Sequence, residues 1–227
     1  NAIKKNVFMF NIHCSNGSKT MKEVSELVKE SNSESLLIGV TVLTNLGEND
    51  IFEMFRSELK LEEIVLNLAT LARNSGMHGI VCSPQETKDV KKKLGKDFVT
   101  VCPGVRPKFT LNADGKSNDD QTRIMTPSDA IKQGVDFLVV GRPITKAENP
   151  LESAKLVLEE ISEEDEWIEF IFLVAIPSEI ERKMESELLE LYDDIFRIAG
   201  EPSLKEALRA VETETEFLSF SKSKGVF

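Results

Sequence analysis

The sequence has 227 residues, of which 41% are hydrophobic and 30% charged, a composition typical of an ordinary globular protein. Its formal net charge of −11 argues against a nucleic-acid partner, because binding to phosphate backbones requires clustered Lys and Arg. No apolar run approaches the roughly 20 residues that span a bilayer, and no secretory signal is visible. We therefore expect a cytoplasmic protein with no membrane partner.

The cysteines and histidines argue against metal chemistry. Cys14, Cys82 and Cys102 are odd in number, and each lies within or at the end of an apolar run. This placement favours reduced thiols in a core over disulfides or metal ligands. His13 and His78 are the two imidazoles of the sequence, so a zinc site is not expected. We expect no metal and no cofactor.

Short aliphatic runs alternate with amphipathic stretches up to about residue 161, which is typical of βαβ units and a parallel sheet. The runs are almost continuously apolar, as strands covered on both faces must be. The predicted strands are Val7–Ile12, Leu36–Leu43, Gly79–Cys82, Phe98–Cys102 and Asp136–Val140.

Three of the intervening helices have clear sequence signals. Apolar residues at helical spacing run from Leu61 to Ala72 and stop before Gly76. Ser83–Glu86 combines an N-cap, a proline at the first helical position and a capping-box glutamate. Thr126–Asp129 repeats the N-cap and proline before the next helix.

The pattern changes after residue 161. Acidic residues cluster between Glu159 and Glu166, as in a solvated helix end or a linker. A strand-like run at Phe170–Ile176 and a helix over Ser178–Ala199 follow. We predict a first domain at 1–161, an acidic linker at 162–168 and a small α/β segment at 169–227.

Polar residues follow the predicted strands, where barrels of βα units bind their ligands. Thr44 follows the second strand, Arg106 the fourth, and Gly141-Arg142 the fifth. A glycine after a buried strand lets a backbone N–H approach a phosphate, and an adjacent arginine supplies a charged, fork-shaped donor. The alternative is a turn glycine beside a surface ion-pair arginine.

Six motifs in order make the chain resemble bacterial orotidine 5′-phosphate decarboxylase over roughly residues 1–161. They are Asn11-Ile12-His13-Cys14-Ser15, Val40-Thr41-Val42-Leu43-Thr44, Gly79-Ile80-Val81-Cys82-Ser83, Pro103-Gly104-Val105-Arg106-Pro107, Asp120-Gln121-x-Arg123-Ile124-Met125-Thr126-Pro127 and Val139-Val140-Gly141-Arg142-Pro143-Ile144-Thr145. The resemblance implies a TIM (β/α) barrel, here a partial one of about five parallel strands with outer helices.

The resemblance also implies individual roles in binding a pyrimidine nucleotide. Gln121, Gly141 and Arg142 would hold the 5′-phosphate, with Arg106 nearby on the closing loop. Thr44 would contact the pyrimidine ring. The alternatives are a strand-end threonine that satisfies local backbone and, for Gln121, a solvated loop amide.

The two histidines receive different predictions. His13 matches a family position near the site, so it is a candidate second-shell residue, although a strand-end histidine is more often structural. His78 stands where the family usually has an acidic residue, and we expect it on a surface loop.

The family's catalytic D-x-K-x-x-D motif, which follows the third barrel strand, precedes the region that matches Asn1. The ribose-binding Asp and Lys of the first two strands are also missing. Candidate replacements at Asp114 to Lys116 and Asp119 to Arg123 lie in the long loop, not at a strand end. We therefore predict no catalytic residue and an inactive chain, with five of the eight strands.

The C-terminal segment resembles the last strand and helices of a sugar-phosphotransferase enzyme IIA domain, through Phe170–Pro177, Glu187–Leu191 and Ser203–Leu208. That family's phosphorylated histidine has no counterpart here, so a plain strand with two helices remains the alternative. Three functions stay open: a decarboxylase part that needs the missing strands, a non-catalytic nucleotide- or phosphate-binding protein or fused fragment, and a hexulose-phosphate synthase-like barrel. We expect self-association or a partner that supplies the missing strands.

Overall fold

In the computed structural model, residues 2–5, 7–112 and 123–162 are described. The chain divides into two units, Met9–Leu173 and Asn1–Phe8 with Val174–Phe227. The described part of the second unit includes a 3-10 helix at Ile3–Lys5. All other elements below belong to the first unit. The predicted linker, the strand at 170–176 and the enzyme IIA-like helices lie outside the described residues.

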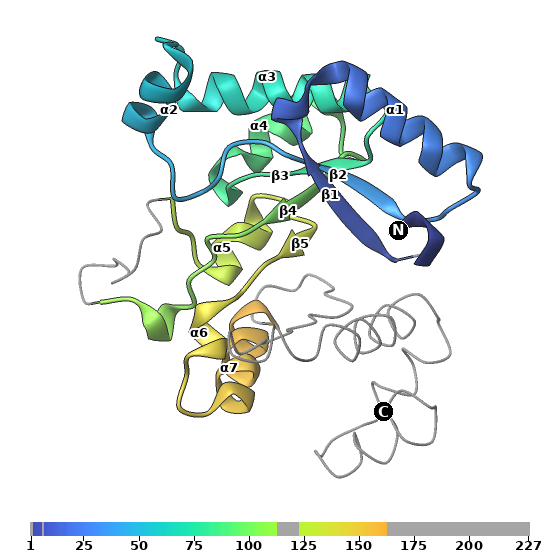
Figure 1. Ribbon diagram of the computed structural model, residues 1–227. Coiled ribbons are helices and arrows are strands. Elements are labelled where there is room, and N and C mark those ends of the chain that lie inside the picture. The colour runs from blue at the N-terminus through green and yellow to red at the C-terminus, as the bar shows by residue number, and fades with distance from the viewer. Residues whose placement is uncertain (1, 6, 113–122, 163–227) are drawn as a thin grey trace, which may run out of the picture. The chain divides into compact units, whose positions relative to one another are not determined.

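The first unit is built on a five-stranded sheet in the order β1-β2-β3-β4-β5, and every neighbouring pair is parallel (Figure 1). All five strands occur where the sequence predicted them. The predicted parallel α/β sheet is therefore confirmed. The strands are β1 (Met9–His13), β2 (Leu36–Val40), β3 (Gly79–Val81), β4 (Val99–Cys102) and β5 (Phe137–Leu138).

β2 is shorter than predicted, and the reason lies in its hydrogen bonds. The Thr41 N–H still donates to the Val81 carbonyl of β3 at 3.2 Å. The next two carbonyls, of Val42 and Leu43, accept instead from the side chain of Arg123. Beyond Thr41, the side chain of Arg123 therefore replaces β3 as the hydrogen-bonding partner of this segment.

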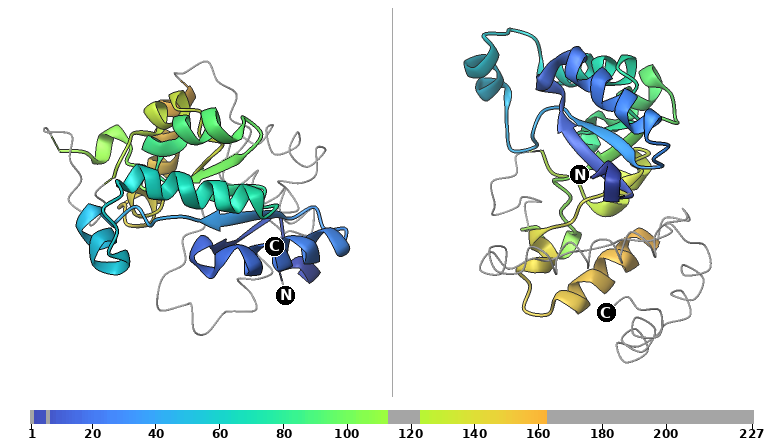
Figure 2. Two further views of the ribbon diagram at one scale, coloured as in Figure 1. Left: turned by 90° about the horizontal axis from the view of Figure 1, so that it is seen from above. Right: turned by 45° about the vertical axis from the view of Figure 1, so that its right-hand side comes forward.

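Helices α1 to α5 lie in the connections between successive strands, and because such crossovers are right-handed, helices that pack on the sheet lie on one face of it. Figure 1 shows α1 beside α3 and α3 beside α4, and Figure 2 shows α3 between the other two from above. The helices are α1 (Gly17–Glu30), α2 (Glu48–Phe55), α3 (Leu61–Asn74), α4 (Pro84–Leu94), α5 (Pro127–Lys132), α6 (Arg142–Thr145) and α7 (Pro150–Ser162), with 3-10 turns η2 (Cys14–Asn16) and η3 (Lys108–Thr110). None of the described helices is long and apolar enough to cross a membrane.

The predicted helix ends are confirmed at atomic detail. The Ser83 hydroxyl accepts from the Gln85 N–H at 3.3 Å, and Glu86 returns a carboxylate to the Ser83 N–H at 2.6 Å. The Thr126 hydroxyl accepts from the Asp129 N–H at 3.2 Å. These bonds satisfy helix N–H groups that have no partner within the helix.

Apolar side chains are buried in two regions of the unit. In the first, Met21 of α1, Val65 of α3, Leu37 of β2 and Ile80 of β3 are fully buried. A second cluster joins the sheet to α5, α6 and α7 and consists of Val105, Ile131, Val140, Ile144, Val157 and Ile161.

The acidic run begins differently from the prediction. Glu160 is not solvated: it is buried on α7, and its carboxylate accepts from the Lys108 N–H at 3.0 Å. The helix continues to Ser162, and Ile161 belongs to the second apolar cluster. The backbone N–H that Glu160 satisfies lies 52 residues away, so composition alone could not indicate it.

His78 lies in the loop before β3, as predicted, but it is not a plain surface residue. The residue is half-buried, and its ring Nδ1 accepts from the Leu37 N–H at 2.9 Å, while the His78 backbone N–H donates to the Leu37 carbonyl at 2.9 Å. The His78 ring therefore adds one hydrogen bond between β2 and the residue that precedes β3. Burial lowers the pKa of His78, and the nearby Lys29 charge acts in the same direction.

The cysteines behave as predicted: Cys14, Cys82 and Cys102 are buried free thiols. Cys82 directly follows β3 and Cys102 ends β4, with their sulfurs 3.9 Å apart. Burial raises the pKa of Cys14 to about 11, so this thiol stays protonated and unreactive near neutral pH.

Candidate functional site

The predicted site residues follow strands that all run in the same direction. Thr44 follows β2, Arg106 follows β4, and Gly141 and Arg142 follow β5. Because the strands are parallel, these segments leave the sheet at the same end. The topology thus agrees with the expectation that they contribute to one site.

Thr44 lies in the segment that connects β2 to α2, and its side chain is buried. The segment is held close to β3 because the Thr41 hydroxyl donates to the Val81 carbonyl at 2.7 Å. A turn follows, closed by the Leu46 N–H on the Leu43 carbonyl at 3.0 Å. Thr44 is therefore part of an ordered loop at the strand ends.

Arg106 is buried, with 4% of its surface exposed. Its guanidinium donates to the Val105 carbonyl at 2.8 Å, and its backbone N–H donates to the Met125 carbonyl at 2.9 Å. Residues 105 and 125 also form a parallel bridge. The loop after β4 is thereby joined to the segment that precedes α5.

Gly141 lies at the N-terminus of the short helix α6, with its carbonyl accepting from the Ile144 and Thr145 N–H groups at 2.9 and 3.1 Å. A Cβ built on Gly141 would meet nothing within 4 Å, so there is open space beside its backbone. Arg142 follows it and is half-buried. This arrangement is compatible with a phosphate contact at Gly141 and Arg142, which stays a prediction.

The two remaining predicted site residues are Gln121 and His13. Gln121 falls in residues 113–122, outside those described. His13 ends β1 with an exposed side chain, and its carbonyl accepts from the Asn16 side chain at 3.0 Å. A role for His13 beside the nucleotide site stays a prediction.

Sequence reasoning gave no role to Arg123, which lies on the segment between β4 and α5 and connects it to the segment after β2 and to the start of α4. One end of its guanidinium donates to the Val42 and Leu43 carbonyls after β2, at 3.2 and 3.0 Å. The other end forms an ion pair with Glu86, in the first turn of α4. Both side chains are nearly inaccessible, with 11% of Arg123 and 4% of Glu86 exposed. The only available signal was the position of Arg123 two residues after Gln121 in the motif.

Glu86 lies in a low-dielectric environment. Burial raises its pKa to about 7, although the Arg123 charge and the hydrogen bond from the Ser83 backbone act in the opposite direction. Desolvation of the carboxylate thus outweighs its ion pair. Glu86 is therefore partly protonated near neutral pH.

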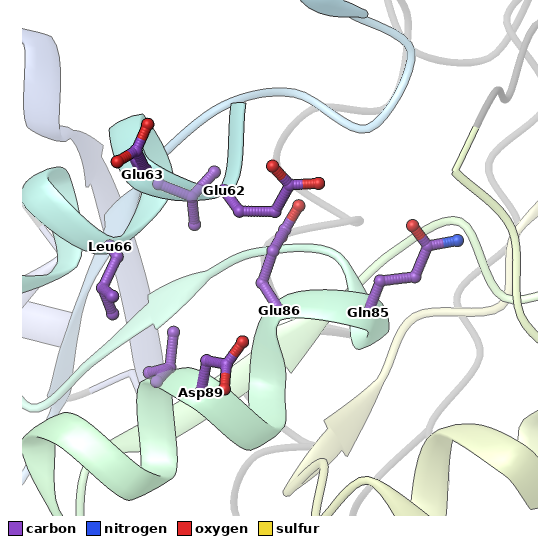
Figure 3. A pocket seen from close by; sticks show the side chains of 8 residues that line it. Glu62, Glu63, Leu66, Gln85, Glu86 and Asp89 are labelled. Atoms are coloured by element: carbon purple, nitrogen blue, oxygen red, sulfur yellow. The ribbon is translucent and has the colours of Figure 1, made fainter. Parts of the chain in front are cut away.

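A cavity of about 210 Å³ lies between α3 and α4, and Figure 3 shows Glu86 among the acidic side chains that line it. Its lining contains none of the predicted site residues. It is formed by Glu62, Glu63, Val65, Leu66, Gln85, Glu86, Asp89 and Val90. The described part of the chain holds no group of three or more His, Cys, Asp or Glu side chains suited to a metal ion.

One segment has the spacing of the catalytic D-x-K-x-x-D motif. Asp114, Lys116 and Asp119 match it letter by letter, but they lie in the long segment after β4, outside the described residues. A match of three letters is weak evidence for chemistry. Lys116 nevertheless offers a direct control for any activity assay.

Most of the chain is similar to known proteins of one family. Residues 1–157 match the model of the orotidine 5′-phosphate decarboxylase / HUMPS family. Orotidine 5′-phosphate decarboxylase of Staphylococcus saprophyticus is 46% identical over 150 residues, covering 66% of this chain and 63% of that protein. The decarboxylase of Neisseria meningitidis serogroup C is 46% identical over 145 residues, covering 64% of this chain and 56% of the relative.

The fold comparison agrees. The crystal structure of orotidine 5′-phosphate decarboxylase from Lactobacillus acidophilus matches with a TM-score of 0.55 and 29% identity, over 70% of this chain and 66% of that one. The chain therefore spans roughly two thirds of such a barrel, which confirms the predicted partial (β/α) barrel. By its matched residues and its fold, this chain belongs to the orotidine 5′-phosphate decarboxylase / HUMPS family.

Proposed function

We propose that this chain is the phosphate- and pyrimidine-binding part of an orotidine 5′-phosphate decarboxylase, the enzyme that converts orotidine 5′-phosphate to UMP and CO2. The observation that carries the proposal is the family match over residues 1–157, which includes the segments after β2, β4 and β5. The parallel sheet supports a common site for those segments. In this proposal Gln121, Gly141 and Arg142 bind the phosphate, Arg106 lies nearby and Thr44 contacts the base.

The chemistry itself is assigned to the family's D-x-K-x-x-D motif, which directly follows none of the five described strands. In the family motif a lysine protonates the carbanion left by CO2, between carboxylates that destabilise the bound substrate. Energy from binding a remote phosphate accelerates a reaction only if it is used at the reacting centre. We therefore propose that the chain binds the nucleotide without decarboxylating it. A non-catalytic nucleotide-binding role is the second candidate and predicts the same binding.

The partner follows from the same comparison. β1 and β5 are the outer strands of the described sheet, each with one neighbouring strand in it. Open strand edges pair readily with other chains. We propose that they are completed by the family's remaining βα units or by a second copy of this chain. The free, buried cysteines support a reducing, cytoplasmic location.

Calorimetric titration with UMP tests the binding proposal. Removing a charged hydrogen-bond partner costs about 1.5–3 kcal/mol, so Arg142→Ala should weaken binding by roughly tenfold or more. Lys146→Ala is the matched control. Lys146 is an exposed cation just after α6, so this substitution removes the same charge as Arg142→Ala. Equal affinities for wild type and Arg142→Ala, or no UMP binding by the wild type, would contradict the proposal.

A further inference from the structure

The largely buried side chain of Arg123 connects the loop that carries Thr44 to the start of α4. Its Nη2 donates to the carbonyls of Val42 and Leu43, the two residues that directly precede Thr44. These carbonyls follow the end of β2, where the ladder with β3 stops. Without Arg123 the Val42 carbonyl would need another donor, and the Leu43 carbonyl would keep only the Leu46 N–H of its own turn, so the guanidinium helps to fix where this part of the loop lies.

Glu86 holds the guanidinium in place from the other side. One carboxylate oxygen pairs with Arg123, while the other accepts from the Ser83 N–H at 2.6 Å in the capping box of α4. The carboxylate is therefore fixed to the helix at one oxygen and to Arg123 at the other. A planar guanidinium with several fixed donors can serve Glu86 and two carbonyls together, which a lysine ammonium cannot do in the same geometry.

The arrangement is a poor device for stability alone. Buried ion pairs commonly gain little over apolar side chains of similar size, because both charges must be desolvated. Burial also raises the pKa of Glu86, and the Arg123 Nε is buried without a hydrogen-bond partner in the described part of the chain. Such a cost is consistent with a role in placing the loop.

We propose that Arg123 is a positioning residue of the nucleotide site: by holding the Val42 and Leu43 carbonyls it places Thr44 against the pyrimidine ring. The inference rests on the proposed function and adds a residue to it. It concerns the base and not the phosphate, because Arg123 holds the segment after β2, whereas Gly141 and Arg142 follow β5. The contributions of the base and of the phosphate to binding can therefore be measured separately.

The experiment compares the affinity for UMP with that for ribose 5-phosphate, which has the phosphate but no base. Arg123→Met should weaken UMP binding by roughly fivefold to tenfold, the scale of one lost hydrogen bond to the ligand, and leave ribose 5-phosphate binding unchanged. Thr44→Val should give the same pattern. The double variant should be no weaker than the worse single variant, because both changes remove one contact.

Two controls keep the result interpretable. Arg73→Met removes an arginine ion pair with Asp97, which precedes β4 at the opposite end of the sheet, and should leave both affinities unchanged. Arg123→Lys retains the positive charge, so it provides a second test if the methionine variant does not fold. It should still weaken UMP binding selectively, because one ammonium cannot serve both carbonyls and Glu86.

Each outcome decides between the proposals. If wild type binds both ligands and Thr44→Val weakens only UMP, while the folded Arg123 variants bind UMP normally, the positioning role is overturned and the proposed function stands. Loss of both ligands in the Arg123 variants also overturns it, since a general structural role would produce that result. If wild type binds neither ligand, the proposed function fails, and the positioning role fails with it.

Discussion

The raised pKa of Glu86 predicts how the stability of the protein depends on pH. A carboxyl group whose folded-state pKa exceeds its unfolded value binds its proton more tightly in the folded state. Its contribution to stability is then fully present below the unfolded pKa of 4.5 and is lost as the pH rises through the folded pKa of about 7. The perturbation that isolates this effect is Glu86→Gln, which removes the titration and keeps an oxygen for the Ser83 N–H.

The magnitude follows from the shift. The two pKa values, 4.5 and about 7, differ by about 2.5 units. At about 1.4 kcal/mol per unit this corresponds to roughly 3 kcal/mol of unfolding free energy. Glu86 is nearly inaccessible, with 4% of its side chain exposed, so solvent screens the effect little. Wild type should therefore lose roughly 3 kcal/mol relative to Glu86→Gln between pH 4.5 and pH 7.5.

Urea unfolding followed by circular dichroism at pH 4.5, 6, 7 and 8 measures this difference for the two proteins. Comparing the variant with wild type at each pH cancels the contributions of other titrating groups, including His78. A constant difference across this range would refute the reasoning. So would a wild type that gains stability relative to the variant as the pH rises, because that is the behaviour of a carboxylate stabilised by its ion pair.

Two further predictions concern His78 and the sheet edges. The pKa of His78 is lowered, so the stability that this neutral ring contributes is present above its unfolded pKa of 6.5 and lost as the pH falls through the folded pKa. His78→Ala leaves the buried Leu37 N–H unpaired and should cost about 1–3 kcal/mol at pH 7.5 and much less at pH 5, measured by urea unfolding; an equal cost at both pH values would contradict this. If β1 and β5 offer open edges, sedimentation velocity should show concentration-dependent association of the purified chain, and a monomer throughout the micromolar range would count against it.

Most of the fold was predictable because local patterns encode it. Apolar runs of strand length located all five strands, and Ser83 and Thr126 marked helix starts because their hydroxyls satisfy the first free N–H groups. Glu160 and His78 were misjudged for a shared reason. Each satisfies a backbone N–H that is distant in sequence, and such pairings leave no local pattern.

The site was predictable in part for the same reason. Motif order indicated Thr44, Arg106 and Arg142, and the parallel strands put their segments at one end of the sheet. Arg123 lay within a quoted motif, but its partners are 37 residues away at Glu86 and about 80 away at Leu43. Only the three-dimensional structure reveals that one arginine connects these segments.

The central claim is that this chain binds the nucleotide without carrying out the reaction, and release of CO2 from orotidine 5′-phosphate tests it most directly. The substrate, labelled in its carboxyl group, is incubated with purified chain at high concentration, beside Arg142→Ala and Lys116→Ala. We predict release at the uncatalysed rate in all three samples. Release by the wild type well above that rate, abolished by both substitutions, would contradict the claim and identify Lys116 as the catalytic lysine.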